Sequence, residues 1–448
     1  MQRTERLDIF FRFSSLLSPL PRRGIFYKAG LYIAAGLPYN VIMNNKNAFK
    51  GVAATPDNPR WRDFTARQSE LYSREDEIRS PFARDYTRIL HCTAFRRLKH
   101  KTQVFYNVDN DHVCTRLEHV AHVESVANTI AKYLGLNDEL TRAISFGHDL
   151  GHAPFGHYGE RVLSDISKAN NLGIFWHERN GLRLVDKLEL LEDSNKKLRN
   201  LNLTYAVRDG IISHCGEVDQ NGIRPRGELI ELEEFDSVGK YQPATWEGCV
   251  VKISDKIAYI GRDIEDALSL GFLTRGQLSE LEEVSGAVNT TVIVHDLISD
   301  ICKNSSPEKG ICLSNEAAQK LNAVKAFNYK NIYSNSRFKA YQDYAKLVLN
   351  GMFEFLMSFY APGYAAANVH KAAKEYPLLC SSFSGWLAKL CLPSAVPEEL
   401  KGEAERSLGE KIYGNLSDGQ TYAQAVVDFL SCMTDKYAVR AHAELLSY

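Results

Sequence analysis

The part of the chain that decides the fold lies at residues 115–157 and reads TRLEHVAHVESVANTIAKYLGLNDELTRAISFGHDLGHAPFGH. Apolar residues recur through its first half at intervals of three and four, which is the spacing of one face of an α-helix. These residues are Val120, Val123, Val126, Ala127, Ile130, Ala131 and Leu134. Gly135 ends this helix, and a second helix is expected from about 138 to 150, before Gly151. The stretch therefore predicts two consecutive helices.

Helical periodicity continues on both sides of this stretch. We expect helices at about residues 158–168, 178–192, 205–214 and 248–270, and further helices with Pro, Gly and Asn breaks beyond about 275. Residues 219–246 are acidic, contain Gly and Pro, and predict a loop or a short hairpin. Strand-like alternation is scarce, so the sequence predicts an all-α protein. We divide it into an N-terminal extension (1–60), a helical core (61–275) and a C-terminal helical region (276–448).

Composition excludes several classes of protein. The 448 residues include 54 Lys+Arg and 55 Asp+Glu, and 44% are hydrophobic. This excludes collagen-like, mucin-like and wholly disordered chains, and the near-neutral charge argues against a dedicated nucleic-acid coat. The nine cysteines form no CxxC pair, which suits a reducing compartment and predicts a cytoplasmic protein. Since no apolar run reaches 18 residues, we expect no membrane-spanning helix.

The first 50 residues are read separately from the core. Basic residues precede a weakly apolar stretch at 29–43, which Gly36 and Pro38 interrupt. A signal peptide needs a cleaner apolar region and a small-residue cleavage site. A loosely packed arm and an upstream extension with Met43 as the natural start both remain open, and we assign this segment no function.

Two histidines and an aspartate suggest a metal site. His119 lies at the start of the first helix, and the adjacent pair His148 and Asp149 lies at the end of the second. Consecutive residues at a helix end can both reach one ion. Imidazole nitrogens and a carboxylate suit Mn, Fe, Co, Ni or Zn better than a magnesium site made only of oxygen ligands. A fourth ligand is needed, and Asp255 is the best candidate.

Asp255 belongs to a polar stripe on the helix expected at 248–270. Asp255, Tyr259 and Asp263 follow one another at intervals of four and therefore share a helical face. Ile253, Ile257, Ile260 and Ile264 occupy the opposite side. From the residues alone, the polar stripe is either a binding surface or a solvated face.

An ordered set of motifs now resembles a known family. The motifs are FRRL at 95–98, KTQVF at 101–105, TRLEH at 115–119, HDLGHAPFGH at 148–157, FWHE at 175–178, SDK at 254–256, and Tyr259 with RD at 262–263. In this order, over residues 70–270, they resemble the HD-domain phosphohydrolases. Among these, the resemblance is to the deoxynucleoside triphosphate (dNTP) triphosphohydrolases, the group that contains the bacterial dGTPases. It implies an HD-domain helical bundle as the core.

The resemblance implies a role for each matching residue. His119, His148, Asp149 and Asp255 would hold a divalent metal ion, with Mn, Fe, Co, Ni, Zn and Mg all open. Arg116 and Lys256 would clamp the triphosphate, whose charges need fixed cations. Tyr259 and Asp263 would contact the deoxyribose, and Gln103 matches a position near the sugar. Arg337, in a segment with little motif support, is assigned as a further phosphate contact.

Other matching residues lie outside the metal set. His152, His157 and His177 match active-site histidines of the family that are not metal ligands. His157, with Glu160 or Glu178 nearby, would transfer a proton to the leaving 5′-oxygen. For His152 and His177, orientation of the ligands or simple packing is an equally open role. His122 departs from the family pattern and is read as a surface residue or as an extra imidazole near the site.

The expected reaction is hydrolysis of a dNTP, dGTP included, to deoxynucleoside and inorganic triphosphate. A 5′-nucleotidase or phosphodiesterase activity is one alternative. A non-catalytic nucleotide- or nucleic-acid-binding module is the other, because residues 96–101 are basic. The resemblance also implies homo-oligomers and, in some relatives, activation by a second dNTP. Base preference cannot be read from the sequence, and binding of single-stranded nucleic acid is compatible with catalysis.

Overall fold

The structure is a computed structural model that describes residues 45–71, 76–106, 110, 112–215, 221–274, 276–285 and 289–447. Most of the expected N-terminal extension, Met43 included, lies outside the described residues. The described residues form one compact unit. The domain boundaries that we drew at residues 60 and 275 both fall inside this unit, and they stay predictions.

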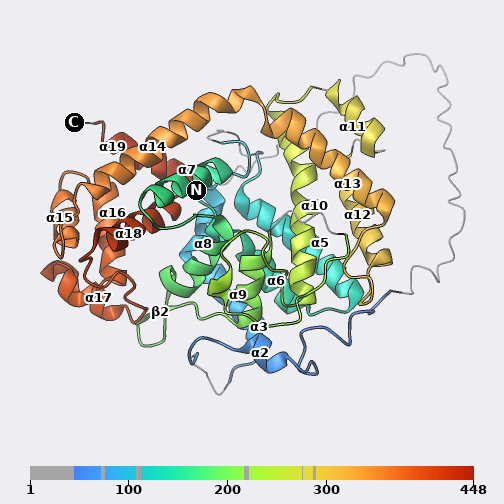
Figure 1. The fold of residues 1–448 in the computed structure, drawn as a ribbon, viewed down its shortest axis with the longest axis horizontal. Helices are drawn as coiled ribbons and strands as arrows, with labels where there is room; N and C mark the ends of the chain where they lie inside the picture. The colour runs from blue at the N-terminus through green and yellow to red at the C-terminus, as the bar shows by residue number, and fades with distance from the viewer. Residues whose placement is uncertain are drawn as a thin grey trace, which may run out of the picture. The chain divides into compact units, whose positions relative to one another are not determined.

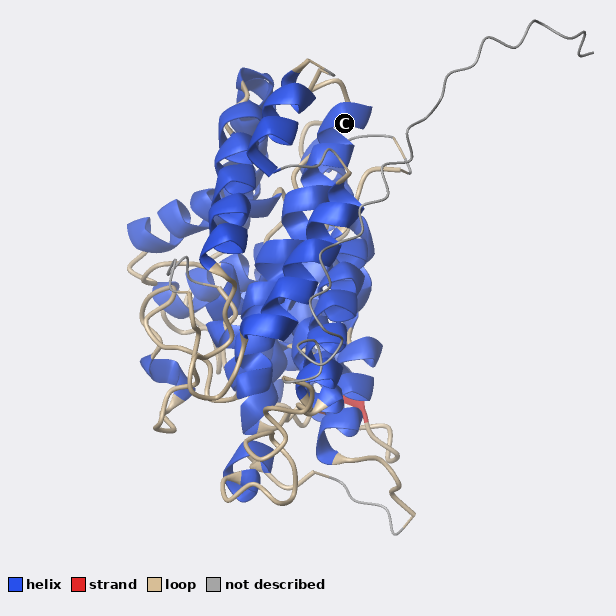
Figure 2. Ribbon diagram, turned by 90° about the vertical axis from the view of Figure 1, so that its right-hand side faces the viewer, coloured by secondary structure: helices blue, strands red, loops and turns tan. Residues whose placement is uncertain are grey.

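Figures 1 and 2 show a molecule built almost wholly of helices, which confirms the all-α prediction. In chain order, the α-helices are α2 (Trp61–Thr65), α3 (Pro81–His91), α4 (Thr93–Arg97), α5 (Arg116–Leu134), α6 (Asp138–Gly147), α7 (Gly156–Ala169), α8 (His177–Arg183), α9 (Tyr205–Ser213), α10 (Trp246–Ser269), α11 (Gln277–Ser285), α12 (Thr290–Asn304), α13 (Asn315–Asn328), α14 (Lys339–Met357), α15 (Ala365–Ala372), α16 (Leu379–Leu390), α17 (Glu398–Arg406), α18 (Gly419–Ser431) and α19 (Asp435–Glu444). Short helical turns lie between them: η1 (Leu98–His100), η2 (His148–Gly151), η3 (Leu184–Leu188), η4 (Leu232–Glu234), η5 (Tyr329–Tyr333), η6 (Ser336–Phe338) and η7 (Pro393–Ala395).

Two short strands pair upstream of residues 219–246, the segment for which the sequence left a loop and a short hairpin open. Strands β1 (Leu190–Glu192) and β2 (Leu198–Asn200) pair antiparallel, with Leu190 opposite Asn200. The helix expected at 178–192 ends earlier, because η3 follows α8 and then gives way to β1. Between residues 221 and 245 the chain is loop apart from η4. The apolar run near Leu190 was therefore wrongly assigned to a helix, an ambiguity that short apolar runs carry.

Helices α5, α6 and α10 pack against one another and make the centre of the core. The side chains on the apolar stripe of α5 are buried. Thr115 and Glu118 form a capping box at the start of α5, and Gly135 ends it in the left-handed conformation, with φ of 81°. These end signals fix the register of α5 and so aim His119 toward α10.

The C-terminal helices pack against the segments that carry the site motifs. Helices α14 and α18 both contact α7 (Figure 1). The buried ammonium group of Lys101 donates to the backbone carbonyl of His152 and, at 3.2 Å, to that of Ser431 at the end of α18. Among the described residues, no helix is both long enough and apolar enough to cross a membrane.

Candidate active site

Four side chains from three elements form the predicted metal group. His119 comes from α5, His148 and Asp149 from η2, and Asp255 from α10. Nε2 of His119 lies 3.0 Å from Oδ1 of Asp255. Nε2 of His148 lies 3.9 Å from Oδ1 of Asp149 and 3.9 Å from Oδ1 of Asp255. The structure therefore brings together all four residues that the sequence assigned to one ion.

The bonding of His148 fits a bound cation. Its Nδ1–H donates to the carbonyl of Ser145 at 2.6 Å, which leaves the lone pair of Nε2 facing two carboxylates. This Nε2 atom is buried and finds no hydrogen-bond partner in the described part of the chain. Burial also lowers the pKa of His148, which favours the neutral, ligating form. A divalent ion would satisfy the buried nitrogen and the carboxylates together.

Arg116 is the buried cation of the site. Its guanidinium is 1% exposed, and Nη1 donates to Oδ2 of Asp149 at 2.9 Å. Nε and Nη2 have no hydrogen-bond partner among the described residues, and the side chain lines the cavity beside the metal group. Arg116 therefore orients one carboxylate of the group and keeps donors available for an anionic ligand.

A cavity of about 520 Å³ collects nearly all of the predicted site residues. Those that line it are Gln103, Arg116, His119, Asp149, His152, His157, Glu160, His177, Glu178, Asp255, Lys256, Tyr259 and Asp263. His148 lies behind this wall in the metal group. Arg337 does not line the cavity: its Nη1 donates to the carbonyl of Gly271 at 3.0 Å, and its guanidinium lies 4.0 Å from the ring centroid of Phe272. Its assignment as a phosphate contact stays a prediction, and His122 is exposed on α5.

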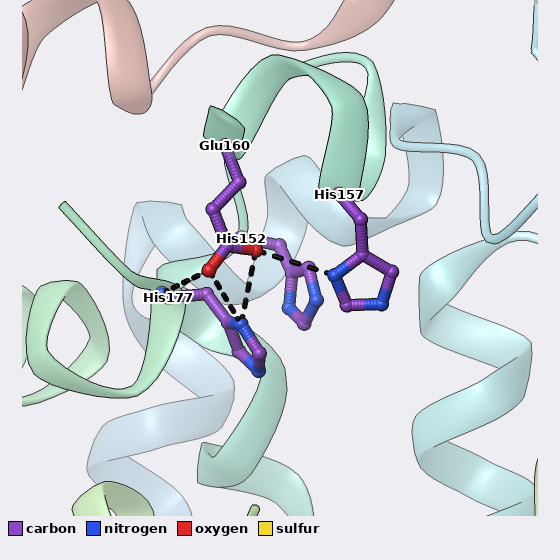
Figure 3. A group of neighbouring side chains, drawn as sticks. All are labelled: His152, His157, Glu160 and His177. Atoms are coloured by element: carbon purple, nitrogen blue, oxygen red, sulfur yellow. Dashed lines mark hydrogen bonds and ion pairs between the residues drawn. The ribbon is translucent and has the colours of Figure 1, made fainter. Parts of the chain in front are cut away.

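A second group lies beside the first, at the start of α7 and α8 (Figure 3). The carboxylate of Glu160 lies between two imidazoles, with Oε2 3.2 Å from Nδ1 of His157 and 3.2 Å from Nδ1 of His177. Burial would raise the pKa of Glu160, but these two histidines hold it well below its usual value. Burial likewise disfavours a charged His177, yet Glu178 and Glu160 raise its pKa well above the ordinary value. The group therefore favours a charged imidazole beside a carboxylate.

Asp263, which also lines the cavity, pairs with a residue that the sequence analysis missed. The hydroxyl of Tyr333, on η5, donates to Oδ2 of Asp263 at 2.5 Å. Burial raises the pKa of Asp263 to about 7, although the Tyr333 hydrogen bond opposes this change. Tyr333 lies in the region beyond 275, where the motif resemblance is thin.

His214 is the other residue that the sequence analysis missed. Its ring centroid lies 5.0 Å from that of His148, and the two share a group of neighbouring donor atoms with Asp149. Its Nδ1–H donates to the carbonyl of Ile211 at 2.7 Å, as His148 does to Ser145. The position of His214 at the end of a predicted helix, like that of His148, was a signal that could have indicated it.

Comparisons with known proteins agree with this geometry. Residues 116–260 match the family model described as the HD domain. A protein from Caldanaerobacter subterraneus subsp. tengcongensis is 34% identical over 389 residues, covering 85% of this chain and 90% of its own. A protein from Desulfatibacillum aliphaticivorans is 37% identical over 372 residues, covering 82% of this chain and 88% of its own. Each of these two is called a deoxyguanosinetriphosphate triphosphohydrolase-like protein, and this chain is similar to both over most of its length.

Proposed function

The chain, which contains an HD domain, belongs to the family of deoxyguanosinetriphosphate triphosphohydrolase-like proteins, and from this premise we propose that it hydrolyses a dNTP to deoxynucleoside and inorganic triphosphate. The observation that carries the proposal is that Arg116 lines the same cavity as the His/Asp metal group. It is a buried cation, and its Nε and Nη2 have no hydrogen-bond partner among the described residues. During transfer, a phosphoryl group needs both a metal ion and a fixed cationic side chain to stabilise its negative charge.

The metal group is assigned to the α-phosphate end of the substrate. His119, His148, Asp149 and Asp255 would hold the divalent ion. A bound ion at such a site supplies Lewis-acid polarisation of a phosphoryl oxygen and a lower pKa for an attacking water. Arg116 keeps Asp149 oriented and, with Lys256, binds the negative charge of the triphosphate.

Recognition of the sugar is assigned to Tyr259 and Asp263, which follow Asp255 on the same face of α10. Tyr259 and Asp263 stand one helical turn apart on α10 and both line the cavity. Asp263 accepts a hydrogen bond from Tyr333, which fixes its carboxyl group for a contact with the 3′-hydroxyl. The ring of Tyr259 would fill the space of a 2′-hydroxyl and so exclude ribonucleotides. Gln103 lines the same cavity and is assigned to the sugar end.

Proton transfer is assigned to His157 and Glu160. Because the Glu160 carboxylate engages Nδ1 of His157, Nε2 is the atom left to exchange a proton with the substrate. Water adds to the α-phosphorus, the bond from phosphorus to the 5′-oxygen breaks, and that oxygen takes the proton from Nε2. The attacking water gives one proton to solvent, and solvent returns one proton to Nε2 of His157, so no net proton is lost from the imidazole. Glu160 stabilises the charged imidazole, as the carboxylate of a catalytic triad does.

Product identification tests the proposal. The protein, loaded in turn with Mn²⁺, Co²⁺ or Mg²⁺, is incubated with each dNTP and with mixtures, and the products are separated by anion exchange. Deoxynucleoside with tripolyphosphate is the expected result. Orthophosphate would point to a 5′-nucleotidase, and hydrolysis only in dNTP mixtures would reveal activation by a second nucleotide. Homo-oligomers and binding of single-stranded nucleic acid stay predictions.

A further inference from the structure

The second histidine group shares no residue with the predicted metal group. It consists of His152, His157, Glu160 and His177, and one donor atom from each lies within 4.8 Å of every other (Figure 3). We infer that these four side chains form a second site for a divalent transition ion, and that an ion bound there blocks the proton transfer assigned to His157 and Glu160. The second half of this inference rests on the proposed function.

The position of His152 is the strongest observation. Its Nδ1 lies 2.8 Å from Oδ1 of Asp149, so this nitrogen is turned toward the first metal group. Its Nε2, on the other edge of a ring that is 3% exposed, finds no hydrogen-bond partner in the described ranges. Figure 3 shows this ring between those of His157 and His177. A histidine that ligates a metal characteristically engages a carboxylate through its other nitrogen. Nδ1 of His152 lies close to the Asp149 carboxylate, although this contact lacks hydrogen-bond geometry among the described residues.

The other donor atoms have spacings suited to an ion. With metal–nitrogen distances near 2.0–2.1 Å, two ligands of a tetrahedral ion lie roughly 3.3 Å apart. Oε2 of Glu160 lies 3.2 Å from Nδ1 of His157 and 3.2 Å from Nδ1 of His177. His157 is 69% exposed, so its ring can move to close the ligand set and leaves a path for the ion. Three imidazoles and one carboxylate favour Zn²⁺, Co²⁺ or Ni²⁺ over Mg²⁺.

Proton and ion then compete for the same atoms. The hydrogens now shared between Glu160 and the two Nδ1 atoms must leave before an ion binds. An ion on Nδ1 of His157 also separates this ring from Glu160, the partner that stabilises its charge during proton transfer. The inference therefore predicts that transition ions in excess of the first equivalent inhibit the enzyme.

Counting bound ions tests the site without any turnover. The full chain is stripped with a chelator, dialysed against buffered Zn²⁺ and measured by mass spectrometry. Two ions per chain are expected for the wild type, one for Glu160→Gln or His157→Gln, and one for Asp255→Ala. His295→Gln removes an exposed histidine on α12 and should keep both ions. One ion in the wild type, or two in Glu160→Gln, would overturn the second site.

His157 is exposed, so His157→Gln should fold even if the buried Glu160 variant does not. The inhibitory role is tested separately, by comparing hydrolysis with occupancy as Zn²⁺ is raised. We expect the rate of hydrolysis to fall at least tenfold as the second Zn²⁺ ion binds, the ion whose binding depends on Glu160. Full activity at two ions per chain would overturn that role. Two ions per chain without hydrolysis of any dNTP would sink the proposed function and leave the second site standing.

Discussion

The backbone N–H of Phe155 donates to Oδ1 of Asp435 at 2.9 Å, across 280 residues of chain. Oδ2 of the same carboxylate accepts from the N–H and the hydroxyl of Thr102, the latter at 2.6 Å. Phe155 is buried and has φ of 65°, a left-handed conformation that a bulky residue rarely adopts. The carboxylate on α19 thus holds the turn that leads from His152 to His157.

Removing this carboxylate should loosen the turn. Asp435→Ala leaves a buried backbone N–H unpaired, which costs about 1–3 kcal/mol of unfolding free energy. The turn that carries His157 then loses its fixed position, so we also expect a lower kcat. Urea denaturation and steady-state kinetics measure the two effects. Asp435→Asn keeps an acceptor oxygen and should lose less of both; equal losses in the two variants would argue against the hydrogen bond as the cause.

Asp255→Ala should lose the ion of the first metal group and its activity together. The substitution removes the carboxylate that lies 3.0 Å from Nε2 of His119 and 3.9 Å from that of His148. Metal content at the first site and product formation are measured on the same preparation. A variant that keeps the ion and full activity would remove Asp255 from the ligand set.

Arg116→Ala should reduce both stability and activity. The substitution removes one cationic partner of the buried Asp149 carboxylate, which keeps its 2.8 Å contact with Nδ1 of His152. Breaking a buried ion pair costs at most about 3–5 kcal/mol. Loss of a fixed cation beside the phosphates should lower kcat/KM by about 10²–10³-fold. Arg96→Ala serves as the control, because Arg96 is exposed and its removal should change the unfolding free energy by less than about 0.5 kcal/mol. If Arg96→Ala lost as much stability and activity as Arg116→Ala, the cause would be the loss of one positive charge anywhere on the protein and not the loss of the buried ion pair.

Asp263 should make stability depend on pH in a defined window. Burial raises its folded pKa to about 7 from an ordinary value of 3.8, so the folded chain binds this proton more tightly than the unfolded chain does. Stability of the metal-free protein should therefore fall as pH rises from about 4 to about 7, by at most about 4 kcal/mol, and this contribution should be constant above that. Asp263→Asn removes the titration, so its stability relative to wild type should be greater at pH 8 than at pH 5. Urea denaturation of both proteins at the two pH values measures the difference. If the unfolding free energies of the two proteins change by the same amount between pH 5 and pH 8, the pKa of Asp263 is not raised in the folded protein.

The fold could be predicted where the signal was local. The α5 stripe, with the Thr115 cap and Gly135 at its ends, predicts a helix that the structure contains. The assignment failed at Leu190, where a short apolar run turned out to be a strand paired with Leu198–Asn200. Whether such a run becomes helix or strand depends on the partner that it meets, and that partner lies outside the local pattern.

The site could be predicted only as far as its motifs extended. The sequence assigned His119, the His148–Asp149 pair and Asp255 to one ion, and the structure brings them within a few ångströms of one another. It gave no indication of Tyr333, since a single tyrosine in a region without recognisable motifs cannot be told from a core residue.

By itself, the sequence determined the helical architecture, through its three-and-four periodicity. The four metal-group residues and the cations expected around a phosphate were predictions that rested on the resemblance of its motifs to a known family. Only the tertiary structure decided which atoms face one another: Nδ1 of His152 toward Asp149, Tyr333 toward Asp263, Arg337 away from the cavity, and Asp435 onto Phe155. The physical reason is that most of these relationships join distant segments, and their geometry is set by how α7, α10, α14 and α18 pack rather than by any local pattern.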